Sequence, residues 1–296
     1  MDVAKLLGMP LNASAHGARV DDMMLLIHVI MLILFVGWGI FFVYCLVRFR
    51  KKANPKADYL GVTNHRSTYL EGAVALVEAI ILIALAFPIW SDLKAKPPTE
   101  QEAGVVVNVV AQQFAWNIHY AGADGIFGRR DINLVDDDNV LGIDRNSPGG
   151  ADDIMSINQL NLPVNKQVLM KLTSQDVIHS IFLPPMRVKQ DAIPGMEIPV
   201  YFTPTMTGNW EIACAQLCGL GHYRMRGFLN IQTDAEYAQW LRENAPGYEE
   251  EEAAEAAPEE SATPPAGEEA PAEGSTPEAG AEGATTAPPQ GEATPH

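Results

Sequence analysis

Residues 214–225 read CAQLCGLGHYRM and place two cysteines, one histidine and one methionine within twelve residues. A disulfide between Cys214 and Cys218 suits an oxidising compartment, but it leaves His222 and Met225 unexplained. Zinc accepts thiolate and imidazole ligands, but it has no need of a thioether. Thiolate, thioether and imidazole together favour copper. This stretch therefore predicts a copper-binding loop, with the disulfide and the zinc site as alternatives.

The number of cysteines bears on how many copper ions the loop can hold. A mononuclear blue-copper site uses two His, one Cys and a weak axial Met, so this loop has one cysteine too many. A second thiolate allows two copper ions to share a pair of bridging sulfurs, and each ion then needs its own histidine. The best candidate for the second histidine is His179 in DVIHSIFLP, 35 residues before Cys214. Alone, His179 would be interpreted as a core histidine; beside this loop we predict a ligand.

Two apolar stretches precede the loop, at residues 23–47 and 71–90. The first is long enough to span a bilayer core of roughly 30 Å. It is too long for the core of a signal peptide, and no basic stretch directly precedes it. The intervening segment RFRKKANPK, residues 48–56, is basic and is predicted to be cytoplasmic. We therefore expect a transmembrane hairpin with both termini on the outer side.

Glu71 and Glu78 lie in or at the edge of the second apolar stretch. Seven residues is close to two helical turns, so both carboxylates lie on one face of a helix. Ionisable groups at membrane depth are costly and usually face protein or water. One interpretation has Glu71 at the interface and Glu78 hydrogen-bonded to a neighbouring helix. The other is a proton path shared with a larger membrane partner.

From residue 105 onward the chain consists of short β-rich runs separated by Pro, Gly, Asn and Asp, which favours a sandwich or barrel. DAEYAQWLREN is typical of a short closing helix, capped by Asp234 or Thr233. Residues 121–153 are rich in Gly and Asp and predict a long loop with partial strands. The DDDN within it, residues 136–139, is more typical of a solvated acidic loop than of a calcium site.

The net charge of −17 is concentrated at the C-terminus, because residues 249–296 hold 13 Glu and neither Lys nor Arg. The remainder of the chain accounts for only −4. The terminal segment has almost no large apolar side chains and predicts a disordered acidic tail. No basic face is visible, which argues against nucleic-acid binding. Three cysteines do not form a disulfide framework, Cys45 lies in an apolar run, and the absence of C-x-x-C-H excludes a c-type haem.

The chain resembles subunit II of the haem–copper cytochrome c oxidases over about residues 20–240. Four stretches carry the resemblance: CAQLCGLGHYRM, similar to the loop of the dinuclear copper centre CuA; DVIHSIFLPPMRVKQDAIPGM, similar to the upstream histidine segment; STYLEG, similar to the motif before the second membrane helix; and AQQFAWNIHYAGADGIFG, similar to the aromatic stretch. The resemblance implies a two-helix transmembrane hairpin followed by an all-β cupredoxin-like sandwich and the acidic tail. The expected divisions are residues 1–22 (N-terminal periplasmic segment), 23–92 (hairpin), 93–246 (CuA domain) and 247–296 (tail).

Carried over position by position, the resemblance implies a set of copper ligands. Cys214 and Cys218 would bridge two copper ions, His179 and His222 would each bind one ion, and Met225 and the backbone carbonyl of Gln216 would be the weak ligands. Glu71 falls where the family has a glutamate at the mouth of a proton channel.

Three positions depart from the family pattern. Gln216 stands where the family usually has a glutamate that helps to bind magnesium at the subunit I interface, so magnesium is doubtful here. Phe114 stands at the place of the tryptophan through which electrons enter, while Trp116 matches a second aromatic. Both are candidates for electron entrance. Glu78 stands where relatives often have proline.

The function implied by the resemblance is that of the electron-accepting subunit of a terminal respiratory oxidase in a bacterial inner membrane. Electrons from cytochrome c, another c-type haem donor or a donor respiratory complex would pass through copper to haem in subunit I. Oxygen reduction there would be coupled to proton pumping, and subunit III would be a further partner. Asp176 and Arg224 flank the ligands and are expected either to tune the site or to be solvated loop charges.

Three rivals remain. A membrane-anchored metallochaperone does not explain Glu71 and Glu78, and a soluble copper domain similar to that of nitrous oxide reductase does not explain the hairpin. The third rival is a zinc-stapled structural domain.

Overall fold

The structure is a computed structural model of the 296-residue chain, and it describes residues 8–56, 59–61 and 63–247. The predicted acidic tail, from residue 248 onward, lies outside the described residues, as do the first seven residues of the predicted N-terminal segment.

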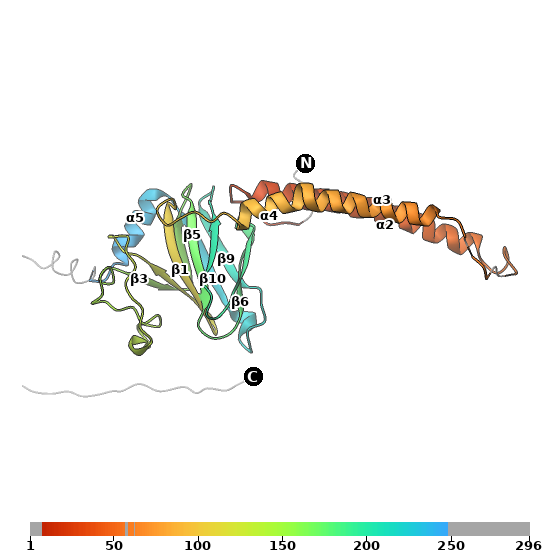
Figure 1. The fold of residues 1–296 in the computed structure, drawn as a ribbon. Coiled ribbons are helices and arrows are strands. Elements are labelled where there is room, and N and C mark those ends of the chain that lie inside the picture. The colour runs from red at the N-terminus through yellow and green to blue at the C-terminus, as the bar shows by residue number, and fades with distance from the viewer. Residues whose placement is uncertain (1–7, 57–58, 62, 248–296) are drawn as a thin grey trace, which may run out of the picture. The chain divides into compact units, whose positions relative to one another are not determined.

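Two long apolar helices form the N-terminal part, as predicted (Figure 1). The first is α2 (Gly17–Arg48). The second runs through α3 (Arg66–Ile81), the π-helical turn η1 (Leu82–Ala86) and α4 (Phe87–Lys94). Both are strongly apolar, and their most apolar stretches are not buried within the described part of the chain. Such helices are long enough to cross a bilayer, where their apolar side chains would face lipid or other apolar helices.

The π-helical turn has a local explanation in the sequence. Pro88 is the second residue of α4, and Phe87 separates it from the end of η1. Proline has no N–H, and its ring clashes with the carbonyl four residues earlier, so a regular helical ladder is disfavoured at this point. The N–H of Phe87 bonds instead to the carbonyl of Leu82, five residues back.

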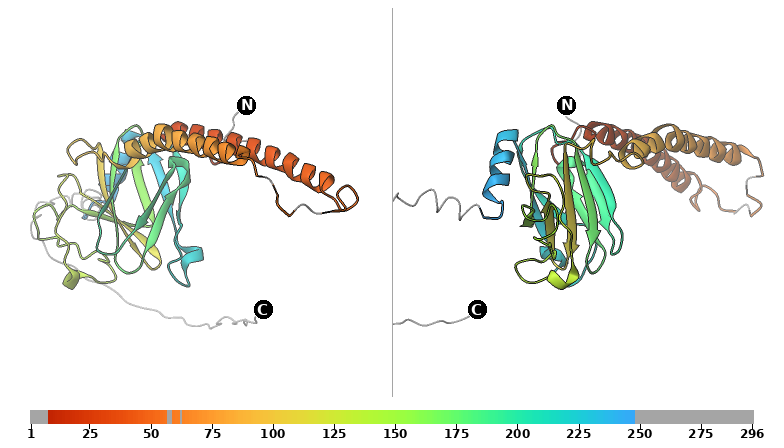
Figure 2. Two further views of the ribbon diagram at one scale, coloured as in Figure 1. Left: turned by 45° about the vertical axis from the view of Figure 1, so that its right-hand side comes forward. Right: turned by 60° about the vertical axis from the view of Figure 1, so that its left-hand side comes forward.

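The C-terminal part is the predicted β-sandwich (Figure 2). Its sheets have the orders β3-β2-β1-β5-β8 and β4-β10-β9-β6-β7. The strands are β1 (Val105–Gln112), β2 (Ala115–Tyr120), β3 (Ile154–Ile157), β4 (Gln159–Pro163), β5 (Val168–Ser174), β6 (His179–Leu183), β7 (Val188–Ala192), β8 (Ile198–Phe202), β9 (Gly208–Cys214) and β10 (Arg226–Gln232). Each sheet contains one parallel pair, β1 with β5 and β4 with β10, among antiparallel neighbours.

A single apolar core fills the space between the two sheets. Trp116, Tyr120 and Met170 from one sheet and Ile181 and Leu229 from the other are among its fully buried members. Burial does not alternate strictly along β2, where residues 116–120 are all buried, because the core covers one face of this strand and segment 121–153 covers the other. The core holds the strand ends in place, and these ends build the site described below.

The closing helix α5 (Asp234–Glu243) begins as predicted, with Thr233 as the N-cap. The Thr233 side chain accepts the N–H of Glu236, and the Glu236 carboxylate accepts the N–H of Thr233, so the two form a capping box. Trp240 packs edge-on against Tyr120 at 4.9 Å between ring centroids. This contact joins α5 to the sandwich core.

The long segment 121–153 is a loop, as expected, but it packs on the outer face of β1 and β2. The His119 imidazole and the Asp153 carboxylate are both wholly buried, and their Nε2 and Oδ2 atoms lie 2.6 Å apart. Leu141 and Ile143 form a small apolar cluster with Val110 of β1. In the DDDN stretch the three aspartates are exposed, as a solvated loop requires.

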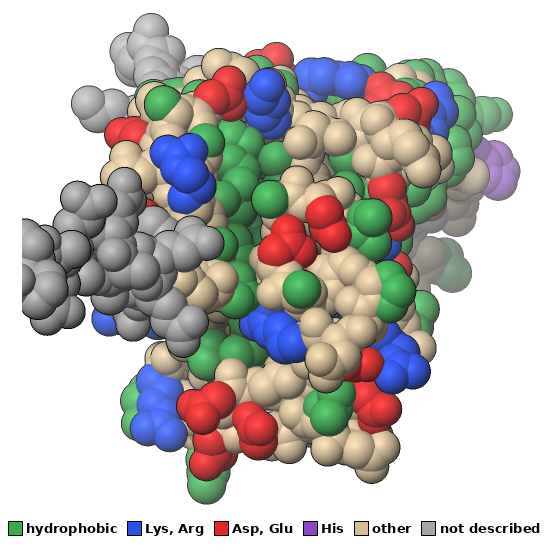
Figure 3. Space-filling view, turned by 90° about the vertical axis from the view of Figure 1, so that its left-hand side faces the viewer, with side chains coloured by type: hydrophobic (Ala, Val, Ile, Leu, Met, Phe, Trp, Pro, Cys, Tyr) green, Lys and Arg blue, Asp and Glu red, His purple; other side chains and the backbone are tan. Residues whose placement is uncertain are grey.

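The surface charge of the sandwich is mixed on the face shown in Figure 3. Among the described residues of this face, Lys and Arg side chains are interspersed with Asp and Glu. A surface of this kind lacks the large single-sign field that steers charged partners over long distances.

Candidate metal centre

The predicted ligands are brought together at one end of the sheet β4-β10-β9-β6-β7. His179 opens β6 and Cys214 closes β9, and these strands pair with Ile181 opposite Cys214. The loop 215–225 then turns back through a short 3-10 helix, η4 (His222–Arg224), into β10. Because β9 and β10 are adjacent antiparallel strands, this loop closes over the end of β6.

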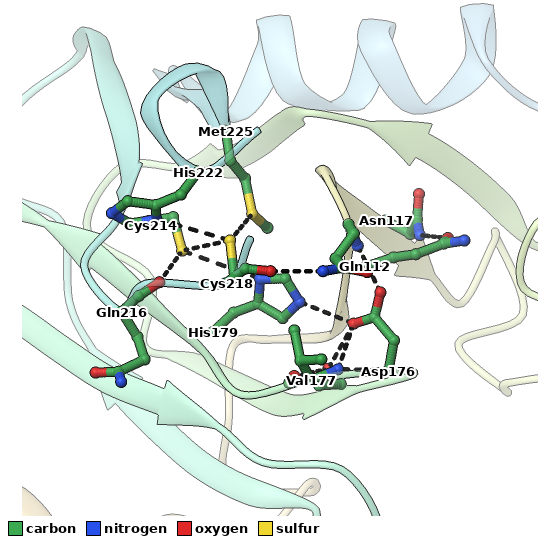
Figure 4. Close-up of polar contacts among 12 residues, drawn as sticks. Gln112, Asn117, Asp176, Val177, His179, Cys214, Gln216, Cys218, His222 and Met225 are labelled. Carbon is green, nitrogen blue, oxygen red and sulfur yellow. Dashed lines mark hydrogen bonds and ion pairs between the residues drawn. The ribbon is translucent and has the colours of Figure 1, made fainter. Parts of the chain in front are cut away.

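The sulfur, nitrogen and oxygen atoms of the six predicted ligands converge (Figure 4). The two cysteine Sγ atoms lie 3.9 Å apart. The Cys214 Sγ lies 4.0 Å from His179 Nδ1 and 3.3 Å from the carbonyl oxygen of Gln216. The Cys218 Sγ lies 3.6 Å from His222 Nδ1 and 3.7 Å from Met225 Sδ. Each thiol thus has one imidazole and one weak donor beside it.

The donor set fits copper better than zinc. Both cysteines are free thiols, and the ligating atoms of His179, Cys214 and Cys218 lie within 4.8 Å of one another. Two thiolates and two imidazoles would complete a tetrahedral zinc site. The buried Met225 thioether against Cys218 has no part in such a site, whereas thioether and thiolate together select copper.

Burial changes the acidity of one thiol. Desolvation, followed by the repulsion of the neighbouring Cys214, raises the pKa of Cys218 to about 11. The metal-free thiol therefore stays protonated at neutral pH, and a metal that binds there must displace the proton.

Asp176 fixes the orientation of one predicted ligand. Its Oδ1 accepts a hydrogen bond from Nε2 of His179 at 2.9 Å, so Nδ1 is the nitrogen that faces the cysteines. Partial burial opposes ionisation of Asp176, but hydrogen bonds from His179 and from the N–H groups of Gln113 and Val177 outweigh it, so the pKa of this carboxyl is lowered. Carboxylate partners of this kind hold the tautomer and ring plane of metal-binding histidines. Of the two flanking charges, Asp176 therefore contacts the site, while Arg224 is exposed.

Replacing Asp176 with alanine is expected to lower copper affinity by about 10- to 100-fold, because His179 loses the partner that orients its ring. Competition with a copper chelator measures the change. Asp137→Ala, in the exposed loop 121–153, is the matched control and should leave the affinity unchanged. Equal affinities for the two variants would show that Asp176 does not orient His179.

The β1–β2 turn supports the copper loop from the opposite sheet. The Gln113 side chain donates from Nε2 to the Cys218 carbonyl at 2.6 Å. The Phe114 ring lies against Gly219 and Gly221, and a Cβ atom at Gly221 would overlap it. Gly219 also has a φ of +134°, a conformation that favours glycine. Sequence reasoning missed Gln113, whose only signal was its place between the β1 run and the two aromatics.

The remaining predicted residues lie at different depths. Trp116 is fully buried and its ring meets that of His179 edge-on, with centroids 6.2 Å apart. Phe114 is only partly buried, so of the two aromatics it is the one that reaches the surface. Glu71 is exposed on α3, within the apolar helices rather than in the sandwich.

Two family models of known proteins match this chain. The family profile for the periplasmic domain of cytochrome c oxidase subunit II matches residues 105–231, and that for its transmembrane domain matches residues 4–91. The alternative cytochrome c oxidase subunit 2 of Bradyrhizobium diazoefficiens is 31% identical over 208 residues, covering 69% of this chain and 72% of the relative. Cytochrome c oxidase subunit 2 of Synechocystis is 27% identical over 261 residues, covering 80% and 76%.

Among solved structures, the periplasmic domain of cytochrome oxidase subunit II from Bradyrhizobium japonicum is similar to this chain, with 28% identity and a TM-score of 0.37. That comparison covers 50% of this chain and 96% of the solved one.

Proposed function

This chain belongs to the cytochrome c oxidase subunit II family of haem–copper oxidases, and on that premise we propose that it is the subunit through which electrons enter its oxidase. The observation that carries the proposal is the convergence of two thiols, two imidazoles, a thioether and a carbonyl at one end of the sandwich. When bound there, a pair of copper ions supplies reversible one-electron chemistry.

The protein's part in this function is to hold the donor atoms still. Cys214 and Cys218 would supply two thiolate sulfurs, and His179 and His222 would each supply an Nδ1 atom. His179 is held by the register of β6 and by Asp176, and the loop is held by Gln113. Ligands that are fixed from several sides move little when an electron arrives or leaves, which favours fast transfer.

The proposed route begins with a c-type haem donor and ends at haem in subunit I, where oxygen would be reduced with proton pumping. Phe114 is the proposed point of electron entrance because its ring is partly exposed and lies on the copper loop. Trp116, buried against His179, would act only behind it. Glu71 is proposed to serve the mouth of a proton channel shared with subunit I, and subunit III completes the proposed complex. Magnesium is not part of the proposal, because Gln216 lacks the charge of a carboxylate.

The proposed location is a bacterial inner membrane, crossed by the two apolar helices. The basic segment 48–56 would lie on the cytoplasmic side, and the sandwich and both termini on the periplasmic side. The proposed domain divisions at residues 22, 92 and 246 follow this topology.

The test is to purify the full chain in detergent, load it with copper, count the bound metal and record the EPR spectrum. Two copper ions per chain and a seven-line hyperfine pattern, from one electron shared by two equivalent nuclei, are expected. One copper ion with a four-line pattern, or preferential retention of zinc, would contradict the proposal. The first would favour a metallochaperone and the second a zinc-stapled domain.

A further inference from the structure

A buried arginine lies at the end of the sandwich opposite the copper loop. Arg187 follows the 3-10 turn η3 (Pro184–Met186), which joins β6 to β7, and it has a positive φ of 54°. Its side chain is only 6% exposed, although arginine is among the residues least often buried. A conformation and a burial that both disfavour arginine indicate that its contacts are specific.

The guanidinium of Arg187 joins three parts of the chain. Its Nε and Nη2 donate to the two carboxylate oxygens of Asp21, in the first turns of α2, at 2.7 and 3.0 Å. Nη2 also donates to the carbonyl of Pro10 at 2.8 Å, and Nη1 to that of Pro184 at 2.7 Å. One side chain therefore connects the N-terminal segment, the first apolar helix and the β6–β7 turn.

The segment before α2 is pinned to the same place by its backbone. Ala13 is fully buried, its N–H donates to the carbonyl of Pro185 at 2.8 Å, and its own carbonyl accepts the N–H of Thr205 at 2.9 Å. The N–H of Ala15 donates to the carbonyl of Thr203 at 3.0 Å. These backbone hydrogen bonds join the segment before α2 to two loops of the sandwich. The Arg187 side chain adds bonds to the start of α2 at the same place.

We propose that Arg187 is a positioning residue that fixes the orientation of the β-sandwich, with its predicted copper site, relative to the two apolar helices. The inference rests on the proposed function, since orientation matters only if electrons leave the copper site for a partner anchored in the same membrane. Strand β6 carries His179 at one end and leads through η3 to Arg187 at the other. A strand of this length is a rigid connection of roughly 15 Å, so a change at Arg187 tilts the site as a unit.

The chemistry of the ion pair suits positioning more than stabilisation. A buried ion pair contributes little net stability compared with apolar side chains, because both charges lose water. What a bidentate arginine–carboxylate pair provides is a fixed geometry, which lysine does not reproduce. By contrast, the ion pair between Arg19 and Asp92 is about half exposed and consists of a single hydrogen bond. It should therefore contribute little to the orientation of the sandwich.

The experiment uses the assembled oxidase with Arg187→Gln in this subunit and Arg19→Gln as the matched control. We expect Arg187→Gln to keep the copper EPR signal of the wild type and the rate of copper reduction by a soluble donor. The rate of electron transfer from copper to haem, measured after a light pulse reduces the copper site, should fall several-fold. Hydrogen exchange at the amides of Ala13, Ala15 and Thr205 should accelerate by roughly a hundredfold, as expected when one partner of a buried pair is lost. Arg19→Gln should change neither the rate of electron transfer to haem nor the hydrogen exchange of these amides.

An unchanged transfer rate together with an intact copper signal would overturn the proposal. If Arg187→Gln fails to assemble, Asp21→Asn and Arg187→Lys make the same test, because each keeps the shape or the charge while losing the bidentate pair. A wild-type chain without the copper signal would contradict the proposed function instead. The hydrogen-exchange measurement would still decide whether Arg187 holds the N-terminal segment. Unchanged exchange in Arg187→Gln would refute that role, whether or not the chain binds copper.

Discussion

Cys218→Ser is expected to abolish the two-copper EPR signal and, with it, oxygen consumption supported by a cytochrome donor. The Cys218 Sγ lies at the middle of the site, within 4 Å of the Cys214, His222 and Met225 donor atoms. A serine hydroxyl is a hard donor that stays protonated, so it cannot replace a bridging thiolate. Metal analysis, EPR and oxygen uptake of the reconstituted oxidase measure the three parts of this expectation.

Cys45→Ser is the matched control, because Cys45 lies in α2 and has no metal-binding neighbour among the described residues. It should retain both copper ions and full activity. A Cys218→Ser protein that kept two copper ions and the seven-line spectrum would refute the assignment of Cys218 as a bridging ligand.

Trp116→Ala is expected to lower the free energy of unfolding of the metal-free protein by about 3–5 kcal/mol, the usual cost of truncating a fully buried tryptophan. Trp116 is wholly buried between the sheets and meets the His179 ring, so its loss leaves a cavity beside a predicted ligand. Denaturant unfolding followed by circular dichroism measures the change in the sandwich.

Trp116→Phe separates volume from hydrogen bonding. The indole Nε1 of Trp116 has no hydrogen-bond partner within the described part of the chain, so phenylalanine loses volume but no hydrogen bond. We expect it to recover most of the lost stability. A Trp116→Ala change below about 1 kcal/mol, which is typical of surface sites, would contradict the central place of this residue in the core.

The sequence predicted the features that arise from local patterns. Hydropathy alone located both apolar helices, and the alternation of short β-rich runs predicted the sandwich. The loop at residues 214–225 specified its donors because five of the six predicted ligands lie within twelve residues. His179 was found because a histidine inside a β-run has few other roles beside such a loop.

The features that sequence reasoning missed depend on contacts between distant segments. Asp21 and Arg187 are 166 residues apart, and Gln113 meets Cys218 over 105 residues. Neither contact can be predicted from the neighbouring sequence, because an Arg or a Gln near a turn is common. The parallel pairs β1–β5 and β4–β10 were likewise not predictable, because strand order is decided by how the two sheets cover each other.

The position of β10 has a consequence for the order in which the protein matures. This strand inserts between β4 and β9, and residue 225, directly before it, carries the thioether. A chain that folds as it is synthesised from its N-terminus has His179, Cys214 and Cys218 before it has the strand that closes the loop over them. Pairing β10 with β4 must also bring together segments separated by about seventy residues, which makes it a slow step. If copper binds as proposed, its full set of donors is therefore complete only after β10 has been synthesised and has paired with β9.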